Sequence, residues 1–376
     1  MSTNYVQLDE ITATLPSAYY YDSEHFEREL NRIWYRHWLC VGRADKVADV
    51  GDYQVVEVGD QSVVITRGED TRLHAFHNTC RHRGSILCEQ SQGKFRGQRI
   101  VCPYHSWTYS LEGKLIATPW RLEGGGFDVT NYPLYDVAAG EWAGFVFINL
   151  DEDAAAFGEQ TLADIPARLA NWNLTETVTV HTMTVDLECN WKVFWENFSE
   201  CLHCPNVHPE LCRIVPQFRQ GMATGNVVRD DADDSSPLVD GAVTWSVGGK
   251  TDLPWFEGLT EREQRAGQTF GVFQPSGYVV AHVDYARVVH MLALGPEQTQ
   301  LTVSWMVPPQ TLEAPEFSVD KLIELGETVV HEDGRASELN QKGLRSNRHK
   351  SGVLVPQEIF VHEFHDWVRE QLADPA

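Results

Sequence analysis

Four residues that could hold iron stand in two short segments in the first third of the chain. Cys80 and His82 form a Cys-x-His pair, and Cys102 and His105 form a Cys-x-x-His pair. Two thiolates and two imidazoles are the ligand set of a Rieske iron–sulfur cluster, in which two cysteines hold one iron and two histidines the other. Neutral imidazoles leave less negative charge on the cluster, so its potential lies within roughly −150 to +300 mV. The expected role is one-electron transfer.

Zinc is the alternative occupant of this ligand set, because it also binds two Cys and two His. Zinc modules usually group like ligands, whereas each pair here is mixed. Gly84 after the first pair and Pro103 inside the second suit loops held over a small β-domain. The sequence therefore favours the iron–sulfur cluster.

Composition limits the classes of protein to consider. The chain has 376 residues, 42% of them hydrophobic, which is enough for two domains with sizeable cores. It has no run of about eighteen apolar residues that could span a bilayer, and residues 1–10 lack the order of a signal peptide. A formal net charge of −24 argues against nucleic-acid binding. The other cysteines show no regular disulfide spacing, so a reducing cytoplasm is the expected location.

The pattern of apolar residues predicts a helical start, a β-rich region and a mixed second half. Residues 19–39 carry apolar side chains at helical spacing. Short β-branched or aromatic runs predict strands at 53–58, 62–67, 73–78, 108–111, 114–117 and 145–150. Further strands are expected at 178–187, 278–283, 288–294 and 301–307, and helices at 190–202, 319–345 and 356–372. Residues 222–240 are expected to form a loop over the site or a disordered stretch.

A second metal site is predicted in the second half of the chain. Glu200 and His203 are three residues apart, so they would share one face of the expected helix. Pro205 would end that helix and let the chain turn back to present His208. Two histidines and a distant carboxylate form the facial triad of a non-haem iron(II) oxygenase, which leaves positions open for oxygen and substrate. Two nearby histidines alone are weak evidence, but an electron-transfer cluster in the same chain needs an electron acceptor.

Two cysteines flank His203 in this segment. Cys201 and Cys204 have the spacing of a zinc-binding or redox Cys-x-x-Cys pair. We expect them instead to be small packing residues beside the iron site.

Three motifs together resemble the catalytic α subunit of the Rieske non-haem iron oxygenases, the ring-hydroxylating oxygenase family. They are Cys-Arg-His-Arg-Gly, Cys-Pro-Tyr-His-Ser-Trp and Glu-Asn-Phe-x-Glu-Cys-x-His-Cys-Pro-x-x-His-Pro, and the similarity extends over about residues 15–367. With the strand and helix pattern, the resemblance implies an α+β chain in three parts. An N-terminal helical segment (1–39) packs on the catalytic domain, followed by an all-β Rieske domain (40–150). The catalytic domain (151–376) has an antiparallel sheet with surrounding helices, of the helix-grip type.

The family's third iron ligand is an acidic residue on a late helix, and residues 331–334 resemble that region. Helical spacing does not settle the choice, because Glu332 and Asp333 flank the apolar stripe on opposite sides. The resemblance favours Asp333, with Glu332 as the second choice and His331 a poorer one.

The resemblance also implies an assembly and partners. It implies a ring, commonly a homotrimer or a multiple of it, in which one subunit's cluster abuts the next subunit's iron. Glu200 matches the carboxylate that bridges His203 to the neighbour's His105, and Asn197 is a candidate for supporting the ligands. No Gly-x-Gly-x-x-Gly is present, so electrons come from a separate ferredoxin or flavin reductase that uses NADH or NADPH. Five basic residues around the cluster loops could dock that reductase or be scattered solvated charge, namely Arg81, Arg83, Lys94, Arg96 and Arg99.

The substrate is indicated less directly. The Glu-Cys-x-His-Cys-Pro variant resembles a subgroup that acts on quaternary ammonium compounds such as glycine betaine, stachydrine, carnitine and choline. The implied reaction is hydroxylation of an N-methyl carbon with oxygen, followed by loss of formaldehyde. Aromatic faces bind such cations, and the second half offers candidates: Trp245, Trp255, Phe256, Tyr278, Tyr285 and Trp305. The alternatives are a mono- or dioxygenase of an aromatic or other apolar molecule, and a non-catalytic electron-transfer or metal-binding scaffold.

Overall fold

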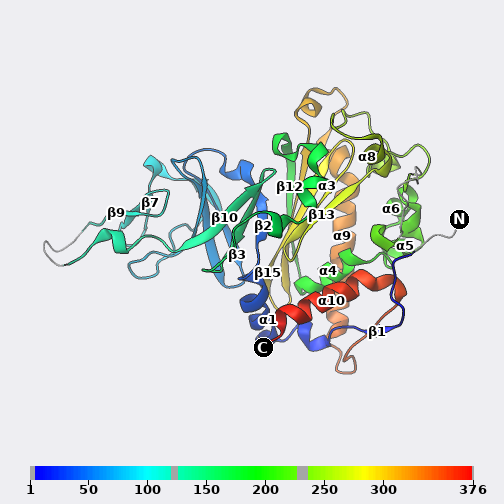
Figure 1. The fold of residues 1–376 in the computed structure, drawn as a ribbon, viewed down its shortest axis with the longest axis horizontal. Helices are drawn as coiled ribbons and strands as arrows, with labels where there is room; N and C mark the ends of the chain where they lie inside the picture. Colours follow the sequence, from blue (N-terminus) through cyan, green and yellow to red (C-terminus); the bar gives the residue numbers. More distant parts are fainter. Residues whose placement is uncertain (1–4, 120–125, 227–235, 375–376) are drawn as a thin grey trace. The chain divides into compact units, whose positions relative to one another are not determined.

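A computed structural model describes residues 5–119, 126–226 and 236–374. The chain divides into two compact units, which are described separately. The β unit consists of Trp34–Ala163 with Phe273–Ser276, and the α+β unit consists of Met1–Ile33, Asp164–Val272 and Gly277–Ala376. Figure 1 shows the elements of both units along the chain.

The β unit contains a seven-stranded sheet of the order β2-β11-β10-β5-β4-β3-β6, in which all the strand pairs are antiparallel. Its strands are β2 (Leu39–Arg43), β3 (Asp52–Val58), β4 (Gln61–Arg67), β5 (Leu73–His77), β6 (Gln92–Lys94), β10 (Asp136–Trp142) and β11 (Phe145–Asn149). A short helix, α2 (Glu159–Leu162), follows them. The strands expected at 53–58, 62–67, 73–78 and 145–150 are confirmed to within a residue or two.

A second, three-stranded sheet carries the segments with the predicted cluster ligands. It consists of β7 (Ile100–Val101), β8 (Thr108–Tyr109) and β9 (Leu115–Ala117) in antiparallel order. The hairpin expected at 108–117 is confirmed. Its turn needs Gly113, because the backbone has φ of +80° and a Cβ there would lie 2.4 Å from the Phe76 ring.

The α+β unit is built on a five-stranded sheet of the order β12-β16-β15-β14-β13. The strands are β12 (Val178–Leu187), β13 (Thr269–Phe273), β14 (Gly277–Ala281), β15 (Ala286–Gly295) and β16 (Gln298–Val307). β12, β16, β15 and β14 pair in antiparallel register. β14, β15 and β16 are almost wholly buried. β14 and β15 read as nearly continuous apolar runs, broken in β15 by Arg287 and His290, whereas β16 alternates apolar residues with Thr302 and Ser304.

Helices surround this sheet. They are α1 (Ser23–Glu29), α3 (Ile165–Arg168), α4 (Trp191–Ser199), α5 (Cys204–Val207), α6 (Pro209–Ile214), α7 (Pro216–Arg219), α8 (Glu261–Ala266), α9 (Val319–Leu344) and α10 (Ile359–Leu372). The long helix α9 packs on both β12 and α4, and α10 packs on α4 (Figure 1). A two-stranded sheet of β1 (Thr12–Ala13) and β17 (Val353–Leu354) joins segments from near the two ends of the chain. The expected combination of a β-rich domain with an α+β domain is confirmed.

The helix expected over residues 19–39 is only partly right. The Asp22 carboxylate accepts a hydrogen bond from the His25 N–H, so α1 begins at Ser23, and a π-helical turn, Leu30–Trp34, follows it. Residues from Leu39 are fully buried strand β2, which pairs with β11. The apolar spacing predicted the buried face of the helix, but it could not show that the buried residues from Leu39 onward belong to a strand.

Two other expectations concern the membrane and one loop. In the part of the chain that the structure describes, every helix is too short or too polar to cross a bilayer. Of the loop expected at 222–240, residues 227–235 lie outside the described residues. A 3-10 turn, Thr224–Asn226, precedes them.

Candidate metal centres and active site

The two segments with the predicted cluster ligands have matching backbone turns. The carbonyl of Cys80 accepts a hydrogen bond from the N–H of Gly84, and the carbonyl of Cys102 accepts one from Ser106. The fourth residue after each cysteine has positive φ, +75° at Gly84 and +56° at Ser106. In both loops the cysteine N–H donates to the carbonyl of the fifth residue after it. Two loops of one geometry therefore present the Cys-x-His and Cys-x-x-His pairs.

The four side chains divide by burial. Cys80 and Cys102 are 2% and 1% exposed, whereas His82 is exposed and His105 is half-buried. The two imidazole rings lie beside each other with centroids 4.6 Å apart, and Trp107 stacks on His82 at 4.9 Å. Two thiols on the buried side and two imidazoles on the outer side suit a cluster whose histidine-bound iron faces solvent or a partner.

Tyr109 contacts the buried side of this ligand set. Its hydroxyl lies 3.3 Å from Sγ of Cys80, and the tyrosine is fully buried. Burial raises the pKa of the Cys80 thiol above its ordinary value, while the Tyr109 hydrogen bond lowers it. A donor held against this sulfur would stabilise a thiolate there.

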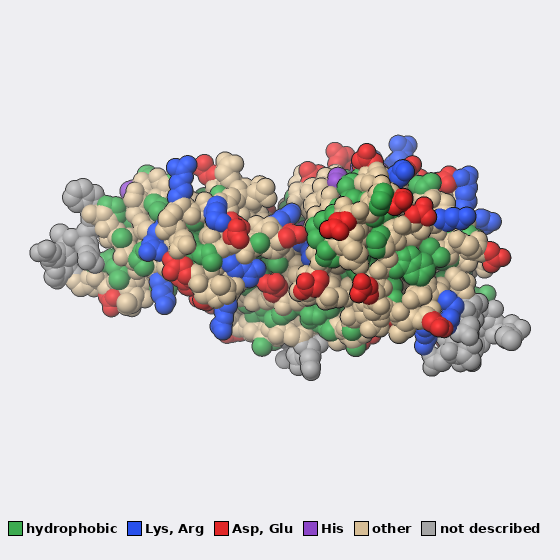
Figure 2. Space-filling view, turned by 90° about the horizontal axis from the view of Figure 1, so that it is seen from above, with side chains coloured by type: hydrophobic (Ala, Val, Ile, Leu, Met, Phe, Trp, Pro, Cys, Tyr) green, Lys and Arg blue, Asp and Glu red, His purple; other side chains and the backbone are tan. Residues whose placement is uncertain are grey.

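The basic residues around the loops are mostly engaged within the chain. Lys94 lies 3.0 Å from Asp52, and Arg99 lies 3.4 Å from Glu69. Arg81 stacks over the Tyr135 ring, with its guanidinium carbon 4.1 Å from the ring centroid. On the face drawn in Figure 2, acidic and basic side chains are interspersed. These contacts favour scattered solvated charge over a dedicated basic dock.

The segment with the second predicted site departs from the expected helix. α4 ends at Ser199, and Glu200 has an extended backbone with φ of −137° and ψ of 174°. The Glu200 carboxylate accepts hydrogen bonds from the backbone N–H groups of Leu202 and His203, which stabilises a turn there. The expectation that Glu200 and His203 share one helix face is therefore wrong. Pro205 does not end a helix either, because it lies in the first turn of α5, where a missing N–H costs no hydrogen bond.

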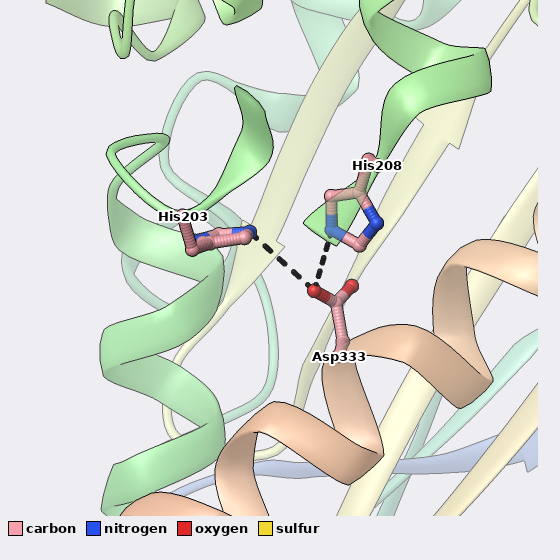
Figure 3. A group of neighbouring side chains, drawn as sticks. All are labelled: His203, His208 and Asp333. Atoms are coloured by element: carbon pink, nitrogen blue, oxygen red, sulfur yellow. Dashed lines mark hydrogen bonds and ion pairs between the residues drawn. The ribbon is translucent and has the colours of Figure 1, made fainter. Parts of the chain in front are cut away.

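This turn nevertheless brings the predicted ligands together with α9. One ligand atom from each of His203, His208 and Asp333 lies within 4.8 Å of the other two. Oδ1 of Asp333 is 2.8 Å from Nε2 of His208 and 3.4 Å from Nε2 of His203 (Figure 3). Two imidazole nitrogens and one carboxylate that converge in this way fit a non-haem iron(II) ion.

A carboxylate also holds the opposite nitrogen of each imidazole. Nδ1 of His203 lies 2.5 Å from Oε1 of Glu200, and Nδ1 of His208 lies 2.7 Å from Oε2 of Glu332. If each Nδ1 donates its proton, each Nε2 is left with its lone pair directed toward Asp333. Carboxylates in this position orient imidazole ligands and raise their basicity. The geometry thus gives Glu332 and Asp333 different positions, which helical spacing alone could not separate.

The electrostatics of the site favour positive charge at its centre. Burial lowers the pKa of His203, but the Asp333 and Glu200 carboxylates outweigh this effect and raise it to about 9. The pKa of His208 is also raised, because Asp333 and Glu332 outweigh burial. Burial would raise the pKa of Asp333, yet the two histidines hold it below its usual value. A metal cation bound here would experience the same favourable potential.

Two other predicted candidates lie away from this centre. The His331 side chain is 58% exposed and faces Glu327 at 4.0 Å. Asn197 is half-buried in α4, and no hydrogen bond joins its side chain to His203, His208 or Asp333.

Cys201 and Cys204 are joined by a disulfide, so the expectation that they are separate packing thiols is wrong. The turn that follows α4 brings their Cα atoms to 5.0 Å, within the range that a disulfide requires. The bond encloses His203, and Sγ of Cys204 lies 3.7 Å from Nε2 of that ring. The six other cysteines are free.

Aromatic rings line one side of the site region. Tyr278 stacks on Phe198 with centroids 3.8 Å apart, and Trp195 lies 6.3 Å from Tyr278. Phe270 contacts both Phe198 and Trp245 edge-on. Trp245 and Phe270 pack in one apolar cluster with Cys201 and Cys204, which flank His203, so this wall adjoins the segment that carries the predicted metal ligands. Of the predicted aromatic residues, Tyr278 and Trp245 belong to the wall, whereas Phe198 and Phe270 were not singled out from the sequence.

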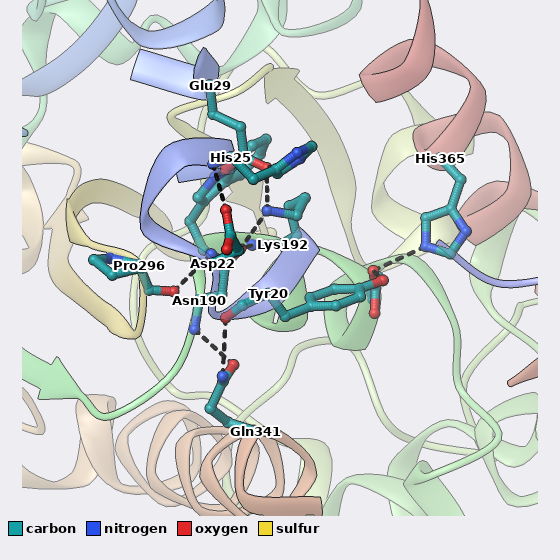
Figure 4. Close-up of polar contacts among 11 residues, drawn as sticks. Tyr20, Asp22, His25, Glu29, Asn190, Lys192, Pro296, Gln341 and His365 are labelled. Atoms are coloured by element: carbon teal, nitrogen blue, oxygen red, sulfur yellow. Dashed lines mark hydrogen bonds and ion pairs between the residues drawn. The ribbon is translucent and has the colours of Figure 1, made fainter. Parts of the chain in front are cut away.

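A buried polar network holds α4 against the N-terminal segment (Figure 4). The Lys192 ammonium, fully buried, pairs with Glu29 and donates to Oδ1 of Asn190 at 2.7 Å. The indole N–H of Trp191 donates to the same Glu29 carboxylate at 2.7 Å. Each charge is therefore paired and hydrogen-bonded, as a buried ion requires. The network fixes the start of the helix whose end leads to Glu200.

The sequence matches two known protein families. Residues 37–133 match the Rieske [2Fe-2S] domain, and residues 174–374 match the ring hydroxylating alpha subunit (catalytic domain). The glycine betaine monooxygenase oxygenase subunit of Chromohalobacter salexigens is 28% identical over 386 residues, covering 96% of this chain and 86% of that protein. Choline monooxygenase of Beta vulgaris is 27% identical over 372 residues, covering 96% and 78%.

Solved structures show the same fold. The quaternary ammonium Rieske monooxygenase CntA in complex with L-carnitine has a TM-score of 0.73 and 25% identity, covering 96% of both chains. Naphthalene 1,2-dioxygenase from Rhodococcus sp. has a TM-score of 0.72 and 18% identity, covering 96% of this chain and 95% of that one. A Rieske 2Fe–2S cluster and a mononuclear iron, the cofactors expected from the sequence, are confirmed by the family matches. The chain belongs to the ring-hydroxylating α subunits, the catalytic subunits of the Rieske non-haem iron oxygenases.

Proposed function

We propose that this oxygenase removes an N-methyl group from a small quaternary ammonium compound of the glycine betaine type. The main support is the aromatic wall beside the three candidate iron ligands, where Phe198 and Tyr278 stack at 3.8 Å. A trimethylammonium group has no N–H to donate, so aromatic faces are the best way to hold it. The glycine betaine, choline and carnitine enzymes among the relatives add support.

The proposed ligand assignments follow the geometry of the two sites. Cys80, His82, Cys102 and His105 would hold the Rieske cluster, and His203, His208 and Asp333 would hold the mononuclear iron. When bound, the iron activates oxygen and the cluster supplies electrons one at a time. Glu200 and Glu332 would keep the Nδ1 protons of the two histidines in place, so that Nε2 of each ring remains the ligand atom.

The proposed reaction balances with two external electrons. One oxygen atom of O2 is inserted into an N-methyl C–H bond, and the other is reduced to water by two electrons and two protons. The resulting hydroxymethyl group releases its hydroxyl proton to solvent and leaves as formaldehyde, and the nitrogen keeps the electron pair of the broken C–N bond. A partner reductase using NADH or NADPH would supply the electrons, in keeping with the name oxygenase subunit that the relatives carry.

We propose that electrons cross between subunits of a homotrimer, with Glu200 bridging His203 to the neighbour's His105. Oε1 of Glu200 already lies 2.5 Å from Nδ1 of His203, which is one half of such a bridge. Inter-subunit electron transfer is described for a quaternary ammonium Rieske monooxygenase of the same fold, with a TM-score of 0.74, and this supports the assembly.

Formaldehyde production tests the proposed function. The iron-loaded enzyme, with a reductase and NADH, is given a panel of methylated amines and simple aromatic compounds, and oxygen uptake is measured in parallel. Formaldehyde in proportion to oxygen uptake is expected with at least one quaternary amine. Coupled oxygen uptake only with aromatic compounds would instead assign the chain to hydroxylation of apolar substrates.

A further inference from the structure

Arg287 in β15 is a buried cation that pairs with none of the carboxylates in the described part of the chain. The residue is 5% exposed, and its Nη1 donates to the carbonyl of Gly326 at 3.2 Å. Among the described residues no carboxylate lies within ion-pair distance of it, and its Nε is buried without a hydrogen-bond partner. Burying an unpaired guanidinium is costly, so a site that keeps one invites an anionic ligand.

A second unpartnered donor lies beside it. Trp305 stands opposite Arg287 across the β15–β16 pair and is fully buried, and within the described chain its indole Nε1 has no hydrogen-bond partner. A Cβ built on Gly326 would lie 2.9 Å from Nη1 of Arg287 and 3.2 Å from Nε1 of Trp305. Both donors thus lie against the surface of α9 at Gly326, where any side chain would crowd them.

The pair lies on the face of the sheet that carries the aromatic wall. Arg287 stands opposite Val280, and Tyr278 and His282 are two residues to either side of Val280, on the same face. Burial raises the pKa of Tyr278, the positive charge of Arg287 lowers it, and the negative charge of Asp333 raises it further. Tyr278 is therefore close enough to feel both the arginine and the candidate iron ligand.

The separation of the donors from the iron ligands matches a short zwitterion. Gly326, against which both donors lie, and Asp333 are seven residues apart on one face of α9, a rise of about 10 Å between their Cα atoms. In a trimethylammonium carboxylate, three bonds of about 1.5 Å separate an N-methyl carbon from the carboxylate carbon. A contact of about 3 Å at each end extends this length to about 10 Å.

We infer that Arg287, together with the indole N–H of Trp305, binds the carboxylate of a quaternary ammonium carboxylate whose methyl groups face His203, His208 and Asp333. This inference rests on the proposed function and narrows it to betaines rather than amino alcohols. Guanidinium–carboxylate hydrogen bonds are charge-assisted and add orientation as well as affinity. The carboxylate would thereby decide which end of the substrate meets the iron.

The test compares two ligands that share a trimethylammonium group. Glycine betaine has a carboxylate where choline has a hydroxymethyl group. Dissociation constants for both are measured by calorimetry on the anaerobic iron-loaded enzyme, and kcat/KM is measured from formaldehyde release. In Arg287→Met, the preference for glycine betaine over choline should fall about ten- to hundredfold, as expected for losing hydrogen bonds to a charged group. Arg369→Gln, at an exposed arginine that pairs with Asp366, should leave the preference unchanged.

A second variant guards against loss of folding. Trp305→Phe keeps the ring and removes only the N–H, and should lower the same preference several-fold while the iron content and thermal unfolding midpoint stay at wild-type values. An unchanged preference in both variants, or a wild-type enzyme that demethylates choline and not glycine betaine, would overturn the carboxylate site and leave the demethylase standing. A wild-type enzyme that binds neither compound would also overturn the carboxylate site, whereas the proposed function is overturned only if no quaternary amine of the panel yields formaldehyde.

Discussion

Oε2 of Glu332 lies 2.7 Å from Nδ1 of His208, while Oδ1 of its chain neighbour Asp333 lies 2.8 Å from Nε2 of the same ring. Two consecutive acidic residues of α9 therefore hold the two nitrogens of one imidazole. Oδ1 of Asp333 also lies 3.4 Å from Nε2 of His203, so Asp333 lies between the two histidines whereas Glu332 contacts only His208. The two acids would therefore have different roles in a metal site. Asp333 would contribute a ligand oxygen, and Glu332 would fix the orientation of His208.

Glu332→Gln is expected to weaken iron binding by about 10- to 100-fold without abolishing it, because an outer carboxylate is lost. Asp333→Ala is expected to lose the mononuclear iron. Iron per chain after dialysis against a chelator series measures both, with the visible spectrum of the Rieske cluster as an internal reference. Glu327→Gln, at a half-buried position on the same helix that faces His331 rather than the site, is the matched control. Equal iron loss in Glu332→Gln and Asp333→Ala would contradict the division of roles.

Glu200→Gln is expected to keep both metals and to lose nearly all NADH-driven turnover. The amide can still accept the backbone hydrogen bonds of the turn, but it cannot carry the negative charge that would join two imidazoles across subunits. Stopped-flow reoxidation of the reduced cluster, in the presence of substrate and oxygen, measures the transfer. Glu210→Gln, at an exposed residue that pairs with Arg213, should react at the wild-type rate. Wild-type reoxidation in Glu200→Gln would remove the bridging role.

Lys192→Met is expected to destabilise the α+β unit by about 3–5 kcal/mol, because Glu29 would remain buried without its partner. The double variant Glu29→Gln/Lys192→Met should recover part of this loss. Urea unfolding followed by tryptophan fluorescence gives the free energy of unfolding of the double variant and of each single variant. Lys342→Met removes an exposed lysine 3.8 Å from Glu188 and should cost no more than about 1 kcal/mol. A double variant as unstable as the sum of its single variants would show that the two charges are not coupled.

Tyr109→Phe is expected to lower the reduction potential of the Rieske cluster. The hydroxyl lies 3.3 Å from the Cys80 sulfur, and hydrogen bonds to cluster sulfurs favour the reduced, more negative state. A bond worth about 1 kcal/mol corresponds to about 40 mV in a one-electron couple. Protein-film voltammetry measures the shift, and Tyr135→Phe tests whether any loop tyrosine has this effect. An unchanged potential would show that the contact does not act on the cluster.

Thiol titration of the unfolded, metal-free protein is expected to find six reactive cysteines before reduction and eight after it, because Cys201 and Cys204 form the disulfide. Peptide mapping of alkylated samples should find this pair protected. The variant Cys201→Ser should give seven thiols without reduction. Eight thiols in protein purified under air would show that the bond does not form.

Local patterns predicted much of the fold and both sets of candidate ligands. Cys80 and His82 lie in one tight turn, so their spacing in the sequence was enough to predict that they lie close together. β12 and α9 have the bounds expected from apolar periodicity to within a residue. Asp333 could be chosen over Glu332 only by family resemblance, because both lie beside the buried stripe of α9. Their distinct contacts depend on where His208 lies, which is a tertiary property.

Other features left no local signal. α4 ends at Ser199 without a proline or glycine that could have predicted its end. The Glu200 side chain instead accepts hydrogen bonds from backbone N–H groups of the turn that follows. Arg287 lies in a strand that is apolar apart from His290, and its contacts with Trp305 and Gly326 join residues that are distant in sequence. The Cys201–Cys204 bond follows from the same unexpected turn.

The pairing of β1 with β17 has a consequence for how the chain is made. Thr12 and Ala13 have Leu354 and Val353 as strand partners, so the α+β unit cannot close until β17 has left the ribosome. All but four residues of the β unit, in contrast, lie in one continuous stretch, Trp34–Ala163. Because domains generally fold as units during synthesis, the electron carrier should acquire its structure first, while Thr12 and Ala13 remain unpaired until β17 has been synthesised.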